Sequence, residues 1–226
     1  MPGAWEIPDV DLHDVKLLVG IPHTELTTVS WALALRALDV PLGTCFFGPA
    51  HYRIDSNRNS IAAMAVEKGF THVLWLDADT EPPPDAFRKL FAVGHPLVSG
   101  FYLRRHPPYN PCVWEDHHES DAIKPLAFPN LGELKDTVVD VDLFGFGCVL
   151  MDVQKTLVRL PPPWFVWTSD EVKPPQGVSE DFFFIRRVRR ELGITPKLHL
   201  GVQCQHNGLM SIRAASDSNP IINSIR

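Results

Sequence analysis

Cysteines are few in this sequence, and they lie far apart. The four present in 226 residues, Cys45, Cys112, Cys148 and Cys204, form no Cys-x-x-Cys pair. A structural zinc site and a disulfide framework both need closely patterned cysteines, so neither is indicated. We expect free thiols that lie mostly in the core.

An excess of positive charge and long apolar runs are also missing. The formal net charge of -6 and an isoelectric point near 5.9 give no electrostatic footprint for wrapping nucleic acid. The basic run RRVRR (186–190) follows apolar FFFI and is interrupted by a valine, a pattern that favours a solvated helix face. No apolar run approaches the roughly 18 residues of a membrane span, and the first residues are acidic where a signal peptide is basic. We therefore expect a cytoplasmic protein with no nucleic-acid partner and no transmembrane segment.

The composition is that of a globular protein with a substantial core. Hydrophobic residues make up 45% of the chain, and neither an internal repeat nor a low-complexity linker interrupts it. A single domain over residues 1–226 is therefore the simplest organisation.

Strand and helix patterns alternate along the first half of the chain. Alternation of this kind predicts an α/β fold with a mostly parallel central sheet flanked by helices. Strands are expected at 15–22, 43–48, 73–76 and 96–103, and helices at 24–38, 56–70 and 85–93. Thr24 is the expected N-cap of the first helix, and Gly69 ends the second.

The second half begins with a long segment that lacks any period. Residues 104–136 are rich in Pro, His and Asn, which indicates a functional or disordered loop. After it we expect two strands and a short helix over 137–160, a helix over 177–192 with Ser179 as N-cap, and a last strand that ends near His206.

Two acids one residue apart follow the apolar strand Val73 to Leu76. Asp77 and Asp79 stand at its carboxyl end, and three prolines come soon after. In parallel sheets ligands bind at that edge, so these carboxylates are well placed for a cation or for sugar hydroxyls. The structural alternative is that they cap the helix after the prolines.

Seven motifs in order resemble one enzyme family. GIP, SNRNSIAAMA, VLWLDADTEPPPDAF, FGFGCVLMDV, PPPWF, SEDFFFIRRVRRELG and a late QH are similar to those of inverting family-2 glycosyltransferases with the Rossmann-like GT-A fold. The resemblance runs from about residue 15 to 208. It implies a nucleotide-binding half at about 15–103, an acceptor half at about 104–208 and a C-terminal tail at 209–226.

The resemblance implies a hexosyltransferase-type activity. A sugar would pass from a nucleotide-diphosphate sugar, with UDP or GDP as the expected nucleotide, to an acceptor hydroxyl with inversion. Mn²⁺ or Mg²⁺ would neutralise the leaving diphosphate. The acceptor would be a glycan, a lipid-linked sugar or a small molecule. A QxxRW element, typical of processive synthases in this family, is absent from the sequence, so transfer should be non-processive.

The same resemblance assigns roles to individual residues. Asp79 and His206 would bind the metal, Asp181 would be the catalytic base, and Glu180 would hold the acceptor, with Trp164 as a further acceptor contact. The expected donor-binding residues are Pro22, His23, Arg58, Asp77, Gly145, Phe146 and Gly147.

Structural interpretations of these residues stay open from the sequence alone. His206 is equally well a structural histidine, and Arg58 would otherwise pair with Asp55. The glycines would form a β-bulge, Trp164 would cover the core, and Glu180 and Asp181 would act only on a helix dipole. A retaining GT-A enzyme and a non-catalytic nucleotide-sugar or carbohydrate-binding module are the alternative functions.

Overall fold

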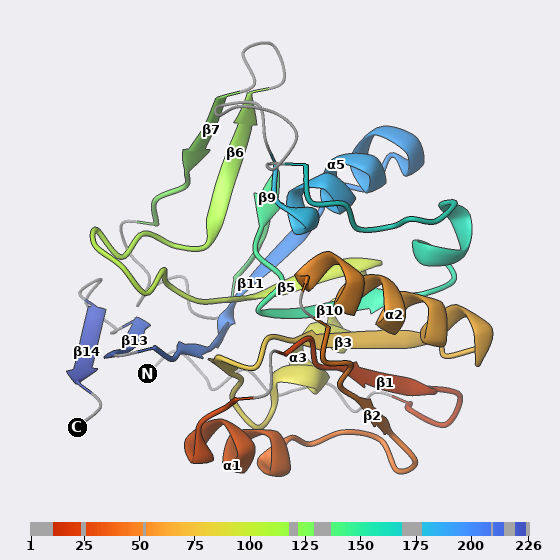
Figure 1. The fold of residues 1–226 in the computed structure, drawn as a ribbon, viewed down its shortest axis with the longest axis horizontal. Helices are drawn as coiled ribbons and strands as arrows, with labels where there is room; N and C mark the ends of the chain where they lie inside the picture. Colours follow the sequence, from red (N-terminus) through yellow and green to blue (C-terminus); the bar gives the residue numbers. More distant parts are fainter. Residues whose placement is uncertain are drawn as a thin grey trace.

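A mixed seven-stranded sheet forms the centre of the protein. The computed structural model describes residues 11–23, 26–51, 53–117, 122–128, 137–168, 178–208, 210–214 and 220–224. The strand order is β2-β1-β3-β10-β5-β11-β8 (Figure 1). All of these strands run in one direction except β10 and β8, which run against it. The expected α/β fold with a mostly parallel sheet is confirmed at this level.

The elements of this central layer follow the predicted alternation. The strands are β1 (Leu17–Gly20), β2 (Cys45–Phe47), β3 (His72–Leu76), β5 (Leu97–Phe101), β8 (Val138–Asp140), β10 (Cys148–Asp152) and β11 (Lys197–Gln203). The helices are α1 (Val29–Ala37), α2 (Ile54–Glu67), α3 (Ala86–Ala92), α5 (Glu180–Leu192) and the short 3-10 helix η1 (Leu157–Arg159). No helix in the described ranges is long and apolar enough to span a bilayer.

Helices cover both faces of the sheet. Successive residues of a strand point to opposite faces, so Val73 and Trp75 of β3 pack with α2 and α5, while Leu74 and Leu76 pack with α1 and α3. Figure 1 shows α2 and α5 on one side of the sheet and α1 on the other. This two-sided burial explains why the strand sequence is apolar without alternation.

Free cysteines lie mostly in these cores, as expected. None of the four forms a disulfide, and Cys112, Cys148 and Cys204 are buried while Cys45 is half-buried.

Helix α1 begins later than the sequence indicates. The expected N-cap, Thr24, lies outside the described residues. The helix starts at Val29, and the Thr28 hydroxyl accepts the Trp31 backbone N–H at 3.1 Å, so Thr28 is the N-cap. Ser179 does precede α5, although its hydroxyl bonds the Asp181 side chain instead of a backbone N–H. Gly69 has a φ of 67° after α2, the left-handed conformation typical of a helix stop.

Two smaller sheets extend from the central one. The first has the order β14-β13-β12-β4 and contains β4 (Thr80–Glu81), β12 (Gln205–His206), β13 (Met210–Ala214) and β14 (Pro220–Ser224). The second has the order β7-β6-β9, with β6 (Val113–His117), β7 (Ala122–Pro125) and β9 (Leu143–Phe144). The residues expected to form only a tail therefore form β13 and β14, which extend this sheet from β12.

The segment 104–136 is not the irregular loop that its composition indicated. It contains the β6–β7 hairpin, which projects away from the central sheet in Figure 1. Its strands are too short and too polar to show a sustained period, and contacts with α5 hold it. Trp114 packs edge-to-face on Phe182, with ring centroids 4.9 Å apart. Residues 118–121 and 129–136 lie outside the described residues.

A buried acid joins the hairpin to α5. The Asp116 side chain is fully buried and accepts two hydrogen bonds from Arg186, at 2.6 and 3.0 Å, while Arg189 lies 3.6 Å away. Arg189 also donates to Asp142 at 2.6 Å. The basic run is therefore only partly a solvated face, because two of its arginines hold the hairpin in place.

Asp116→Ala should destabilise the protein strongly. It leaves Arg186 and Arg189 without their buried partner, and breaking such a pair typically costs about 3–5 kcal/mol. Urea unfolding would measure the loss. Asp140→Ala is the matched control, since Asp140 pairs with Lys197 in an exposed ion pair and should have a much smaller effect. Equal losses of unfolding free energy in the two variants would contradict the role of Asp116 in holding the hairpin on α5.

Candidate functional site

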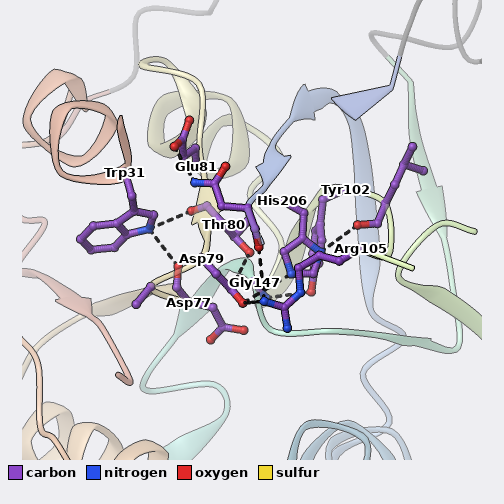
Figure 2. Close-up of polar contacts among 12 residues, drawn as sticks. Trp31, Asp77, Asp79, Thr80, Glu81, Tyr102, Arg105, Gly147 and His206 are labelled. Atoms are coloured by element: carbon purple, nitrogen blue, oxygen red, sulfur yellow. Dashed lines mark hydrogen bonds and ion pairs between the residues drawn. The ribbon is translucent and has the colours of Figure 1, made fainter. Parts of the chain in front are cut away.

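The acids Asp77 and Asp79 stand in a turn that a tryptophan of another element supports. The turn joins β3 to β4, and the Thr80 N–H donates to the Asp77 carbonyl at 3.0 Å. The indole N–H of Trp31, on α1, donates to the backbone carbonyls of Asp77 at 2.9 Å and Thr80 at 3.1 Å (Figure 2). The position of both carboxylates is therefore fixed by the backbone beneath them.

Strand pairing brings His206 to Asp79. Strand β12 lies antiparallel to β4 with His206 opposite Thr80, and the Asn207 N–H donates to the Asp79 carbonyl at 2.6 Å. In this register His206 Nε2 lies 3.6 Å from Asp79 Oδ2 (Figure 2). The structure thus brings together the two residues predicted to bind a metal.

The hydrogen bond of His206 fixes which ring nitrogen faces the acid. Nδ1 lies 2.8 Å from the Leu103 carbonyl oxygen, which can only accept, so Nδ1 carries a proton. A protonated ring would donate Nε2–H to Asp79 Oδ2, and a neutral ring directs the lone pair of Nε2 towards that oxygen. Two electron-pair donors that face each other in this way define a place for a cation.

The charge of Asp79 suits the same place. Burial raises the pKa of its carboxyl, but the His206 ring, Arg105 and Thr80 together hold that pKa below its ordinary value. Within the described ranges, no three His, Cys, Asp or Glu side chains converge on one point. Mg²⁺ and Mn²⁺ bind through one or two protein ligands completed by substrate phosphates, so Asp79 with His206 fits this kind of ion.

Arg58 is buried between the two groups of acids. Its Nη2 donates to Asp77 Oδ1 at 3.0 Å and its Nε donates to Glu180 Oε1 at 2.9 Å. The guanidinium also lies over the ring of Phe146, 5.2 Å from its centroid. Asp55, the alternative partner of Arg58, is instead paired with Arg53.

The ionisation of Asp77 is shifted upwards. Burial raises its pKa most, and the neighbouring charges of Asp79 and Glu180 add to this, while Arg58 opposes them, so that the pKa is about 6. Asp77 therefore titrates near neutrality, whereas Asp79 stays ionised.

Asp181, in the first turn of α5, has a still higher pKa. Burial and the charge of Glu180 raise it, Arg58 and the Ser179 hydroxyl lower it, and the result is about 7. Ser179 Oγ and the Phe182 N–H, at 2.8 Å, both donate to Asp181 Oδ1. Among the described residues no donor bonds Oδ2, which lies 3.8 Å from where a Cβ of Gly145 would stand.

A glycine turn lies between Asp181 and the acids of β3. Strand β10 runs antiparallel, so the turn that precedes it meets the carboxyl end of β3, where the Asp77 N–H donates to the Gly147 carbonyl at 3.1 Å. The Gly147 N–H donates to the Tyr102 hydroxyl at 3.0 Å. A Cβ on Gly145 would lie 2.3 Å from that hydroxyl, and one on Gly147 would lie 2.8 Å from Thr80 Oγ1. Only glycine fits this close approach.

A cavity of about 220 Å³ opens beside Ala78, between the two acids. It lies where β1 and β2 end and α1 begins, and its lining is mostly apolar. Pro22 is buried next to it, and the His23 ring reaches the Gly48 carbonyl with Nε2 at 3.0 Å. The lining residues are Ile21, His23, Leu26, Thr27, Trp31, Gly48 and Ala78.

Four of the predicted residues lie behind the site instead of facing it, and Arg58, whose side chain is 3% exposed, is one of them. Trp164 is buried, and its indole N–H donates to the carbonyls of Leu157 at 2.9 Å and Leu160 at 3.0 Å, so its ring is unavailable to stack on an acceptor. Phe146 is buried beneath Arg58. Glu180, expected to hold the acceptor, has a side chain only 5% exposed and is bound to Arg58.

Sequence reasoning missed several residues of the site. Tyr102 stands directly after β5, at the sheet edge where the acids lie, and that position was the available signal. Arg105 came from the segment without a pattern, and the role of Trp31 depends on a contact between distant elements. The residues missed were Trp31, Thr80, Tyr102, Arg105 and Asn207.

Comparison with known proteins gives a likeness of fold. No family model matches the chain, and no curated protein matches it. Among solved structures, the crystal structure of A197 from STIV is similar with a TM-score of 0.63 and 15% sequence identity, over 94% of this chain and 96% of that one. At 15% identity this similarity is evidence for a shared fold alone.

Gly145→Ala should destabilise the protein by about 1–3 kcal/mol, because its methyl group would overlap the Tyr102 hydroxyl. Tyr102→Phe removes that hydroxyl and alone should cost about 1 kcal/mol through the lost Gly147 hydrogen bond. In the double variant the clash is gone, so its loss should fall below the sum of the two. A double-mutant cycle by urea unfolding measures this. Strict additivity would show that the turn does not pack on Tyr102 in this way.

Proposed function

We propose that this protein is a metal-dependent glycosyltransferase of the GT-A type. It would transfer a sugar from a nucleotide-diphosphate sugar to an acceptor hydroxyl, with inversion and without processivity. The observation that carries the proposal is the arrangement of Asp79 with His206 on one side of a glycine turn and Asp181 on the other. In a displacement reaction, a cation held by Asp79 and His206 would assist departure of the diphosphate. The carboxylate of Asp181, at the other end of the site, would assist attack by the acceptor hydroxyl.

The donor would lie along the edge of the sheet from the cavity to the glycine turn. The apolar cavity beside Ala78 suits a nucleoside, and Asp77 next to it suits ribose hydroxyls. Asp79 and His206 would hold Mn²⁺ or Mg²⁺, which when bound neutralises the diphosphate as it leaves. The Gly145–Gly147 turn, whose glycines let Tyr102 and Thr80 approach the backbone, would lie next to the sugar.

Asp181 is suited to accept the proton of the acceptor hydroxyl. A general base acts best when its pKa lies near the working pH, and burial together with Glu180 places the pKa of Asp181 at about 7. Oδ1 is held by Ser179 and Phe182, so Oδ2 is the oxygen that would take the proton. Glu180 would act through its charge on Asp181, because Arg58 binds it away from the acceptor.

A donor screen tests the function directly. UDP-, GDP- and dTDP-sugars would be incubated with the protein and Mn²⁺, and release of the nucleoside diphosphate would be followed. We expect one donor to be turned over, with loss of release in EDTA and in Asp79→Ala. Thermal unfolding of Asp79→Ala should stay near that of the wild type, since the side chain lies at the sheet edge with 37% of its surface exposed. Nucleoside diphosphate release that persists both in EDTA and in Asp79→Ala would refute a role for a metal at Asp79.

Asp181→Asn should lower turnover by about 10²- to 10⁴-fold with donor affinity nearly unchanged. The base acts deprotonated, so wild-type turnover should fall as the pH drops through about 7, and this limb should vanish in the variant. Glu180→Gln removes a charge that raises the pKa of Asp181, so it should move the limb to lower pH instead. Normal transfer by Asp181→Asn would show that Asp181 is not the catalytic base. Retention of the anomeric configuration in the product would favour the retaining alternative.

A further inference from the structure

Arg105 occupies the position that a cation would take at Asp79. Its Nη1 lies 2.9 Å from Asp79 Oδ2, the same oxygen that faces His206 Nε2. Nη1 also donates to the Asn207 carbonyl at 3.3 Å. Figure 2 shows the guanidinium and the imidazole converging on this carboxylate.

The ion pair between Arg105 and Asp79 can be replaced by another partner of either residue. The Arg105 side chain is 39% exposed, it follows β5 on a loop, and its two partners are a carboxylate and a carbonyl at the rim of the site. Arg58, in contrast, is 3% exposed and enclosed by Asp77 and Glu180. Of these two arginines, Arg105 is therefore the one that can move without leaving a buried charge unpaired.

A guanidinium and a divalent cation cannot share Asp79 Oδ2 without strong repulsion, since like charges at this spacing in a partly buried site are poorly screened. A cation that binds there must displace Arg105. The displaced guanidinium then lies beside the anion that the cation brings, and its planar set of donors matches phosphate oxygens.

We propose that Arg105 is a diphosphate-binding residue that occupies the cation position at Asp79 until a nucleoside diphosphate binds together with its cation. The inference rests on the proposed function and names a residue that the sequence did not assign. It makes cation and nucleotide binding interdependent, because the cation alone must compete with Arg105, whereas the cation with a diphosphate gives Arg105 a new partner.

Removal of Arg105 should therefore change two affinities in opposite directions. In Arg105→Ala, Mn²⁺ without nucleotide should bind about tenfold or more tightly, because its competitor is gone. With Mn²⁺ present, UDP or GDP should bind about 10- to 100-fold more weakly, the size expected for one charge-assisted contact. UMP and GMP, which lack the second phosphate, should be much less affected. A purely structural ion pair would not separate diphosphates from monophosphates.

The experiment combines two measurements on the full chain. Electron paramagnetic resonance of free Mn²⁺ gives the cation affinity, and calorimetry with UDP, GDP, UMP and GMP gives the nucleotide affinities. Arg105→Ala and Arg105→Gln are compared with the wild type and with Arg104→Ala. Arg104 is a neighbouring exposed arginine, so its substitution removes the same charge. We expect both Arg105 variants to show the opposite changes and Arg104→Ala to behave like the wild type.

The outcomes separate this inference from the proposed function. If the wild type binds no nucleoside diphosphate in Mn²⁺, the proposed function and this inference fall together. If the wild type binds and either the Mn²⁺ affinity or the diphosphate affinity is unchanged in the Arg105 variants, the inference alone is overturned. Equal weakening of monophosphates and diphosphates would also overturn it.

Discussion

The buried guanidinium of Arg58 is the charge on which the rest of the site depends. It lies in the core beneath the sheet edge, and its ion pairs with Asp77 and Glu180 join the turn after β3 to the first turn of α5. Without it, Asp77, Glu180 and Asp181 would be a cluster of like charges in a largely apolar setting. The apolar ring of Phe146 supports it from below, which gives a structural reason for an aromatic residue between two glycines.

The same guanidinium allows neighbouring acids to differ in charge. Asp79 is held ionised by groups at the rim, Asp77 has a pKa of about 6, and Asp181 has a pKa of about 7 because Arg58 only partly offsets burial and Glu180. One acid is thus held charged while another titrates near neutrality. Differences of this kind are typical of acid–base sites.

Local patterns in the sequence were sufficient for the central sheet and for the position of the acids. Apolar runs and helix ends are encoded by neighbouring residues, so β3, α2 and α5 were found to within a few residues. The β6–β7 hairpin was missed because it depends on Asp116 meeting Arg186, which is 70 residues away. Arg105 and Trp31 were missed for the same reason, and the burial of Trp164 cannot be read from a proline-rich stretch that fits a lid equally well.

The pairing of β12 with β4 has a consequence for the dynamics of the protein. It joins residues more than a hundred positions apart through strands of two residues each, so a large loop closure is held by few backbone hydrogen bonds. Such a unit opens at a lower free energy than the central sheet, whose strands are packed on both faces. We therefore expect this edge to open more readily than the core, so hydrogen exchange here should be faster than in β3.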